Sequence, residues 1–141
     1  MKVAVIDGQG GGIGKHITEK IRKELGASIE IIGLGTNSVA TSMMLKAGAN
    51  EGATGESAII YTVNEVDVVT GTLSLLVANS MLGEFTPAMA AAVSQSSALK
   101  VLLPIGRNRV EVIGVQQEPL PHLIDMLVKN LKKYREVGEY V

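Results

Sequence analysis

A glycine-rich stretch near the start of the chain is the part of the sequence best suited to bind a ligand. Five glycines fall within residues 8–14, directly after the apolar run Val3–Asp7 and directly before a helical pattern. Glycine lets the backbone turn tightly and approach a phosphate closely, and the start of a helix offers unpaired N–H groups and the positive end of its dipole. The stretch therefore predicts an anion-binding loop made of Gly8, Gln9, Gly10, Gly11, Gly12, Ile13, Gly14 and Lys15.

Residues at the ends of later strands should join this loop. Right-handed crossovers bring the carboxyl ends of parallel strands to one edge of a sheet, and ligands bind there, at the point where the strand order reverses. The expected third and fourth strands end in the segments 70–72 and 104–107, and the second strand ends in a turn. We therefore expect the cofactor site to include Thr36, Asn37, Gly71, Thr72 and Arg107 as well.

The spacing of the glycines separates two kinds of dinucleotide loop. The strict pattern G-x-G-x-x-G does not fit, whereas G-x-x-x-G-I-G fits Gly8, Gly12, Ile13 and Gly14. This second pattern resembles the cofactor loop of short-chain dehydrogenases and reductases. The resemblance implies NAD or NADP as the cofactor.

Two departures from that family limit what the resemblance implies. Neither Tyr61 nor Tyr134 is followed four residues later by the lysine of a Tyr-x-x-x-Lys catalytic pair, so no dehydrogenase reaction is predicted. The acidic residue that would hold the adenosine ribose is also missing, because Leu34–Asn37 stands at the end of the second strand. Its absence removes repulsion of a 2′-phosphate and favours NADP over NAD, although no nearby Arg or Lys is placed to bind that phosphate.

A phosphate-binding P-loop is the alternative interpretation of the same stretch. Gly10–Lys15 is similar to the loop of the nitrogenase iron protein and partition ATPase family, with Lys15 in the place of the phosphate lysine. His16, however, stands where Ser or Thr would hold magnesium, and Asp67 begins its strand instead of ending it as a Walker B aspartate does. The sequence therefore argues against ATP hydrolysis but leaves P-loop-like phosphate binding open.

A third resemblance extends over nearly the whole chain. The segments Asp7–Gly14, Gly83–Ala90 and Ala98–Pro104 resemble a family of short bacterial proteins of unknown function. This resemblance implies a small, standalone Rossmann-like domain, and it implies no activity.

Strand and helix patterns alternate along most of the sequence. Apolar runs predict buried strands over 3–7, 29–34, 66–70 and 99–105, and residues 110–115 should return as an antiparallel hairpin partner. Helices are expected after the glycine loop, over 39–47, from Pro87 to about 97, and after Pro119, while 49–55 should be a loop and 56–64 a helix or a strand. We therefore predict that residues 1–141 form a single nucleotide-binding domain, a three-layer α/β Rossmann-like sandwich whose mostly parallel sheet carries a C-terminal antiparallel hairpin strand.

Composition restricts the classes of function. Hydrophobic residues make up 46% and charged residues 19% of the 141 residues, and the net charge is −1, so we expect neither a nucleic-acid partner nor a membrane partner. Cysteine is absent, which excludes disulfides and thiolate sites, and no His or carboxylate cluster predicts a metal. The sequence opens on a strand pattern instead of a signal peptide, which favours a cytoplasmic location. The apolar composition favours a homo-oligomer, in the first instance a homodimer.

Three classes of function remain open. The preferred one is a binding or sensing module for a small nucleotide or phosphate ligand. The second is a small enzyme whose reactive groups come from Asn79, Glu84, Ser94 or a partner subunit, and a cavity that holds both the loop and Glu84 would favour it. The third is a scaffold whose loop N–H groups are already bonded to protein. Asp7, at the end of the first strand, is expected to cap loop N–H groups instead of binding a ribose or a cation.

Overall fold

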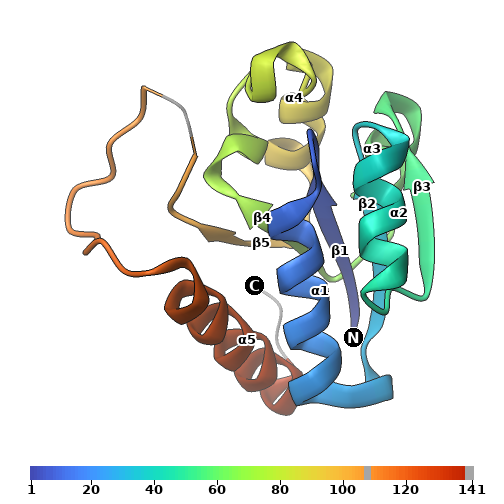
Figure 1. Cartoon of the computed structure of the whole chain (residues 1–141), viewed down its shortest axis with the longest axis vertical. Helices are drawn as coiled ribbons and strands as arrows, with labels where there is room; N and C mark the ends of the chain where they lie inside the picture. The colour runs from blue at the N-terminus through green and yellow to red at the C-terminus, as the bar shows by residue number, and fades with distance from the viewer. Residues whose placement is uncertain (107–108, 139–141) are drawn as a thin grey trace.

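A five-stranded parallel sheet forms the centre of the molecule (Figure 1). The computed structural model describes residues 1–106 and 109–138. The strands are β1 (Lys2–Asp7), β2 (Glu30–Gly35), β3 (Glu51–Thr54), β4 (Val68–Thr72) and β5 (Leu99–Leu103), in the order β3-β2-β1-β4-β5. The chain thus builds outward from β1 to β3, then returns to the other side of β1. This is the strand order of a Rossmann-like fold, and it reverses between β1 and β4.

Helices cover both faces of the sheet and complete the three layers that the sequence predicts. One face carries α1 (Gly12–Leu25), α2 (Ser38–Lys46) and α5 (Leu120–Val137), and the other carries α3 (Glu56–Thr62) and α4 (Pro87–Gln95). Short 3-10 turns lie at Gly26–Ser28, Leu73–Leu76 and Met81–Gly83, labelled η1, η2 and η3. No helix in the described ranges combines the length and apolarity that crossing a bilayer requires.

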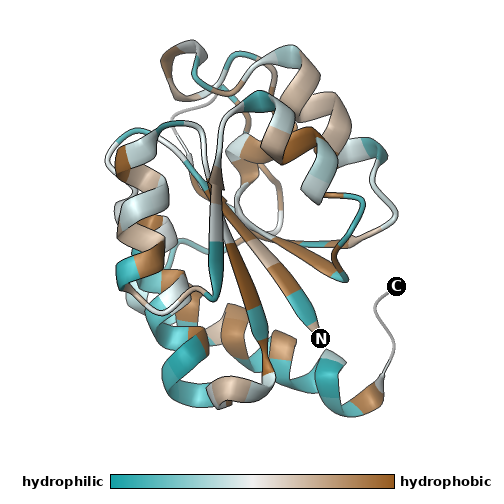
Figure 2. Ribbon diagram, turned by 90° about the vertical axis from the view of Figure 1, so that its right-hand side faces the viewer, coloured by the Kyte–Doolittle hydropathy of each residue, from teal (hydrophilic) through white to brown (hydrophobic). Residues whose placement is uncertain are grey.

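The central strand explains why the sheet is covered on both sides. Val3 and Val5 of β1 belong to the core under α1 and α5, while Ala4 and Ile6 belong to the core under α3 and α4. All four side chains are at most 1% exposed. Figure 2 shows the same arrangement as apolar colour along the strands with polar residues outside. A strand buried on both faces reads as a continuous apolar run, which is why the sequence reveals it.

The predicted hairpin strand over 110–115 is wrong. These residues form no strand, and Val110, Val112, Ile113 and Val115 are all more than 40% exposed. Gly114 adopts a φ of 90°, which breaks the extended alternation that a strand needs. The sheet therefore ends at β5, and residues 109–118 run outside the body of the molecule (Figure 1).

The segment 49–55, expected to be a loop, contains the edge strand β3. Its residues, Glu51 followed by three small ones, are largely exposed, so no apolar pattern marks the strand, and its pairing with β2 is visible only in three dimensions. The undecided segment 56–64 contains the helix α3. Its buried Ile59 and Thr62 are three residues apart, a spacing that places both on one helical face.

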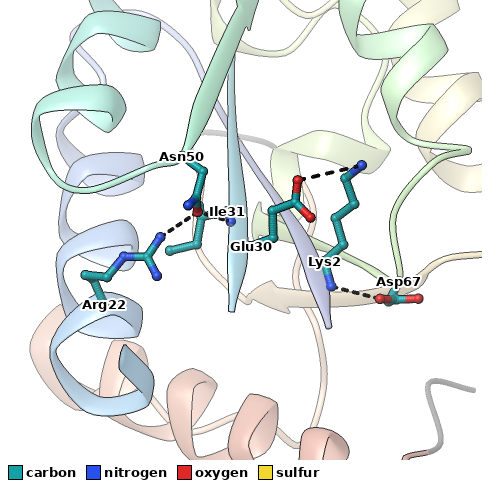
Figure 3. Close-up of polar contacts among 6 residues, drawn as sticks. All are labelled: Lys2, Arg22, Glu30, Ile31, Asn50 and Asp67. Carbon is teal, nitrogen blue, oxygen red and sulfur yellow. Dashed lines mark hydrogen bonds and ion pairs between the residues drawn. The ribbon is translucent and has the colours of Figure 1, made fainter. Parts of the chain in front are cut away.

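Arg22 joins three segments at the amino-terminal edge of the sheet. Its guanidinium donates hydrogen bonds to the carbonyl oxygens of Gly26, Ile29 and Gly48, at 2.7–3.1 Å, and to Oδ1 of Asn50 at 2.7 Å. The same Asn50 oxygen accepts from the backbone N–H of Ile31 in β2 (Figure 3). One planar fork of donors thus satisfies carbonyl groups at the end of α1 and after α2.

The start of β1 is tied to the strands on either side of it. The backbone N–H of Lys2 donates a hydrogen bond at 2.8 Å to the carboxylate of Asp67, the residue just before β4 (Figure 3). The ammonium of Lys2 lies 4.0 Å from the carboxylate of Glu30 at the start of β2. These contacts bring the amino-terminal ends of three strands together.

Replacing Arg22 by alanine should lower the free energy of unfolding by about 2 kcal/mol, because several carbonyl groups lose a charged donor. Arg22→Lys should recover only part of this loss, since an ammonium cannot reproduce the planar fork. Urea denaturation measures both variants. Lys23→Ala, at the exposed next position of the same helix, is the matched control, and an Arg22→Ala protein as stable as this control would contradict the assignment.

Candidate functional site

A cavity of about 380 Å³ opens where the strand order reverses. It lies at the carboxyl ends of β1 and β4, the position where open α/β sheets bind ligands. It brings together the glycine loop, the end of β4 and the segment after β5, as the topology predicted. Its lining residues are Asp7, Gln9, Ile13, Thr72, Ser74, Met81, Leu82 and Gly106.

The carboxylate of Asp7 holds the glycine loop in shape. Its two oxygens accept hydrogen bonds from the backbone N–H groups of Gly8, at 2.8 Å, and Gly14, at 2.6 Å. Gly11 closes the turn by donating to the carbonyl of Gly8 at 3.0 Å, with a left-handed φ of 73°. The expected role of Asp7 as a cap on the loop is therefore confirmed, and these three N–H groups are not available to a ligand.

Three N–H groups of the loop remain open. Within the described ranges, those of Gly10, Gly12 and Ile13 have no protein acceptor, and they lie at the start of α1. A Cβ atom added at Gly10 or Gly12 would meet no heavy atom within 4 Å. The loop thus presents free donors and open space on its outer side, at the positive end of a fourteen-residue helix.

Glu84 covers another part of the loop. One of its oxygens, Oε1, accepts from the backbone N–H of Gln9 at 2.8 Å, the Thr36 hydroxyl at 2.6 Å and the Asn37 side-chain amide at 3.0 Å. The Thr36 hydroxyl, followed by the Gln9 N–H, lowers the pKa of Glu84 below its ordinary value. Thr36 and Asn37, both predicted to bind the cofactor, therefore bind Glu84. Glu84 contacts the loop but does not line the cavity, so the arrangement expected to favour an enzyme, one cavity holding both the loop and Glu84, is not found there.

Unusual backbone conformations gather at this site. The non-glycine residues with left-handed φ in the described part of the chain are Gln9, Asn79, Met81 and Leu82, with φ between 49° and 63°. Gln9, Met81 and Leu82 line the cavity, and Asn79 begins the turn that carries Met81 and Leu82. Such conformations are unfavourable for residues with a side chain and cluster at functional sites. Sequence reasoning missed Met81 and Leu82, because nothing in their residue types indicates a left-handed backbone.

Several other predicted residues in the described part of the chain lie apart from the cavity. The Lys15 ammonium lies 3.9 Å from Glu19 on the same helix. Gly71 has a packing role, because a Cβ there would meet the Ile6 carbonyl of β1 at 2.7 Å. Ser94 donates to the backbone of its own helix, and Arg107 lies outside the described residues. Across residues 1–106 and 109–138, no group of three or more His or carboxylate side chains is arranged to hold a metal ion.

Comparison with known proteins places the chain in a family. Residues 2–136 match the family described as a domain of unknown function, DUF3842, and the chain belongs to this family. The expected relation to an uncharacterised family is confirmed to that extent. No curated protein matches the sequence.

A solved structure with a similar fold is the dodecameric FMN-dependent UbiX-like decarboxylase from Escherichia coli O157:H7. The two structures superpose with a TM-score of 0.52 over 99% of this chain and 96% of that one, at 12% sequence identity. The similarity confirms the α/β Rossmann-like fold with its parallel sheet flanked by helices.

The expectation of NAD or NADP as the cofactor is wrong by the same comparison, because the similar structure is that of an FMN-dependent protein. Residues 34–37, at the end of β2, contain neither the acid that would bind the ribose nor a cation for the 2′-phosphate, and the side chains of Thr36 and Asn37 bind Glu84. Spacing of glycines alone does not report that difference.

Asp7→Ala should lower the free energy of unfolding by about 2 kcal/mol, because the N–H groups of the buried Gly8 and Gly14 lose their acceptor. Urea denaturation at pH 7 measures the loss. Asp125→Ala, which removes a half-exposed carboxylate paired with Lys20, is the control and should have little effect. An Asp7→Ala protein as stable as wild type would show that the Asp7 carboxylate does not hold the glycine loop in shape.

The same variant should reveal the pH dependence of Asp7. Burial raises the pKa of this carboxyl, the N–H groups of Gly14 and then Gly8 oppose the shift, and the charge of Glu84 adds to it. Because the pKa of Asp7 is higher in the folded than in the unfolded state, protonation of this carboxyl stabilises the folded protein. This stabilisation is complete below the ordinary pKa of 3.8 and is lost as pH rises through the folded-state pKa. The stability difference between wild type and Asp7→Ala should therefore widen as pH falls from 7 toward 4.

Proposed function

We propose that the protein binds a small phosphate-bearing ligand of the FMN type in the cavity between β1 and β4. The observation that carries this proposal is the set of open N–H groups on Gly10, Gly12 and Ile13 at the start of α1, beside a cavity at the strand-order reversal. Backbone donors at a helix start are a common phosphate site. The volume of about 380 Å³ falls within the range of small-molecule pockets.

The lining of the cavity suits a ligand with both a flat apolar part and polar edges. Ile13, Met81 and Leu82 offer apolar contacts, while Thr72 and Gln9 offer hydrogen-bonding groups. The similar fold of an FMN-dependent protein supports a flavin mononucleotide over other phosphate compounds. The proposed role is binding. The open N–H groups of the loop hold the phosphate, and the hydrogen bonds from Gly8 and Gly14 to the Asp7 carboxylate keep the loop in the conformation that orients them.

Titration with FMN and with riboflavin, followed by flavin fluorescence, tests the proposal. FMN should bind at least about tenfold more tightly than riboflavin, because only FMN carries the phosphate. Gly12→Val should reduce FMN affinity at least about tenfold by filling the open space outside the loop, while Gly12→Ala should have a smaller effect. Circular dichroism checks that both variants fold. Equal affinity for FMN and riboflavin, or binding unaffected by Gly12→Val, would refute the phosphate role of the loop.

We propose further that the protein is a homo-oligomer, with a homodimer as its smallest form. The similar FMN-dependent protein is described as dodecameric. On this chain, β5 lies at the edge of the sheet, and the neighbouring segment exposes β-branched side chains that belong to no core, namely Val110, Val112, Ile113 and Val115. Exposed apolar segments beside an unpaired strand edge are typical of protein contacts.

Light scattering at about tens of micromolar protein tests this second proposal. The wild-type mass should be a multiple of the 14.8 kDa chain mass. Ile113→Asp, at a side chain 87% exposed, should shift the mass toward the monomer because it places a charge in the contact. Val39→Asp, at an exposed position on α2, is the control and should leave the mass unchanged. A monomeric wild type would overturn the proposal.

A further inference from the structure

Three hydrogen-bond donors converge on a single oxygen atom beside the glycine loop. They are the backbone N–H of Gln9, the hydroxyl of Thr36 and the side-chain amide of Asn37, and we call this set the anion cradle. All three lie within 3.0 Å of Oε1 of Glu84. Three donors around one oxygen, with no lysine or arginine contact to it in the described chain, form a site for a carboxylate or phosphate oxygen.

The cradle is held in place without Glu84. The Oδ1 atom of Asn37 accepts from the N–H of Ala40 at 2.9 Å as the cap of α2, so the amide nitrogen must face away from the helix. That nitrogen also donates to the carbonyl of Gln9 at 3.0 Å, which fixes the loop relative to α2. A Cβ at Gly8 would lie 2.5 Å from the Thr36 hydroxyl and 3.0 Å from Oε1 of Glu84. The absence of a side chain at Gly8 therefore keeps the cradle open to an oxygen atom.

The backbone on either side of Glu84 is anchored by a hydrogen bond between Ser80 and Phe85, which are both buried, whereas the tip of the segment and the Glu84 side chain are exposed. Glu84 follows directly on η3, where Met81 and Leu82 have left-handed backbones, and the Leu82 side chain is 96% exposed. Almost no packing therefore compensates the unfavourable conformation at Leu82. Glu84 itself is exposed, so solvent and solutes reach the cradle.

We propose that the anion cradle binds a carboxylate or phosphate group of a small-molecule ligand, and that Glu84 is an internal competitor which leaves when that group binds. The carboxylate of Glu84 stands in for the ligand oxygen. The proposal deepens the proposed function in one respect, because Gln9 both lines the cavity and belongs to the cradle. The low pKa of Glu84 agrees with a site that stabilises negative charge.

Titration of isotope-labelled protein with acetate and with inorganic phosphate tests the exchange, using the NMR signals of the Gln9 backbone amide and the Asn37 side-chain amide. In Glu84→Ala, both signals should shift saturably, with half-saturation at a concentration at least about tenfold lower than in wild type. Sodium chloride at equal ionic strength is the reference. Glu56→Ala is the matched control, because Glu56 is likewise exposed and accepts a hydroxyl hydrogen bond, from Thr86 at 2.5 Å, remote from the cradle.

Identical titrations of Glu84→Ala and Glu56→Ala would overturn the proposal, as would shifts that chloride reproduces. If Glu84→Ala does not fold, Glu84→Gln replaces it. Glutamine keeps the shape of the side chain but competes for the cradle without a negative charge. An anion affinity of Glu84→Gln equal to that of wild type would then overturn the proposal. The result is separable from the FMN titration. If FMN and riboflavin bind equally but Glu84→Ala still strengthens acetate binding, only the assignment of the phosphate site in the cavity is refuted. If FMN binds more tightly than riboflavin but Glu84→Ala does not strengthen acetate binding, only the anion cradle is refuted.

Discussion

The hydrogen bonds from Gly8 and Gly14 to the buried carboxylate of Asp7 are the interaction on which the ligand-facing end of the molecule depends. They fix the loop between β1 and α1 and so decide which N–H groups face inward and which remain open. A buried carboxylate is costly unless its oxygens are hydrogen bonded, and here two backbone donors meet that need. A protein side chain therefore performs inside the loop the role that a phosphate performs in many glycine loops. The outer donors of Gly10, Gly12 and Ile13 are left for a ligand.

Much of the fold could be predicted from the sequence because its signals are local. β1 reads as an apolar run, α1 shows Ile17 and Ile21 on one face, and α2 and α4 begin at Asn37 and Thr86, residue types that favour the cap position. The segment 110–115 has the composition of a strand but lies outside the sheet. Composition shows that a segment could pair as a strand, but not whether another strand lies next to it in the fold. The edge strand β3 was missed for the opposite reason, because small exposed residues pair through their backbone alone.

The site was predictable in place but not in its contacts. Topology alone put the loop, the end of β4 and the segment after β5 at one edge, and the cavity lies there. The partner of Thr36 and Asn37 could not be inferred, because Glu84 is 47 or more residues away in the sequence. This contact also shows why glycine spacing misled the cofactor assignment. The spacing describes the turn, whereas selectivity depends on what the neighbouring strand ends already hold.

Arg22 gives the molecule two unlike ends. At the amino-terminal edge, a single guanidinium joins the end of α1 to segments before β2 and β3, whereas the opposite edge consists of a glycine turn and a strained exposed segment. Local opening in proteins begins where buried contacts are few, so amide hydrogens should exchange along a gradient that runs from slow at the Arg22 end to fast at the loop end. A ligand seated between β1 and β4 joins parts of the chain that otherwise open separately. A bound ligand would in this way reduce the difference in amide exchange rate between the two ends of the sheet, so that the two ends unfold as one unit.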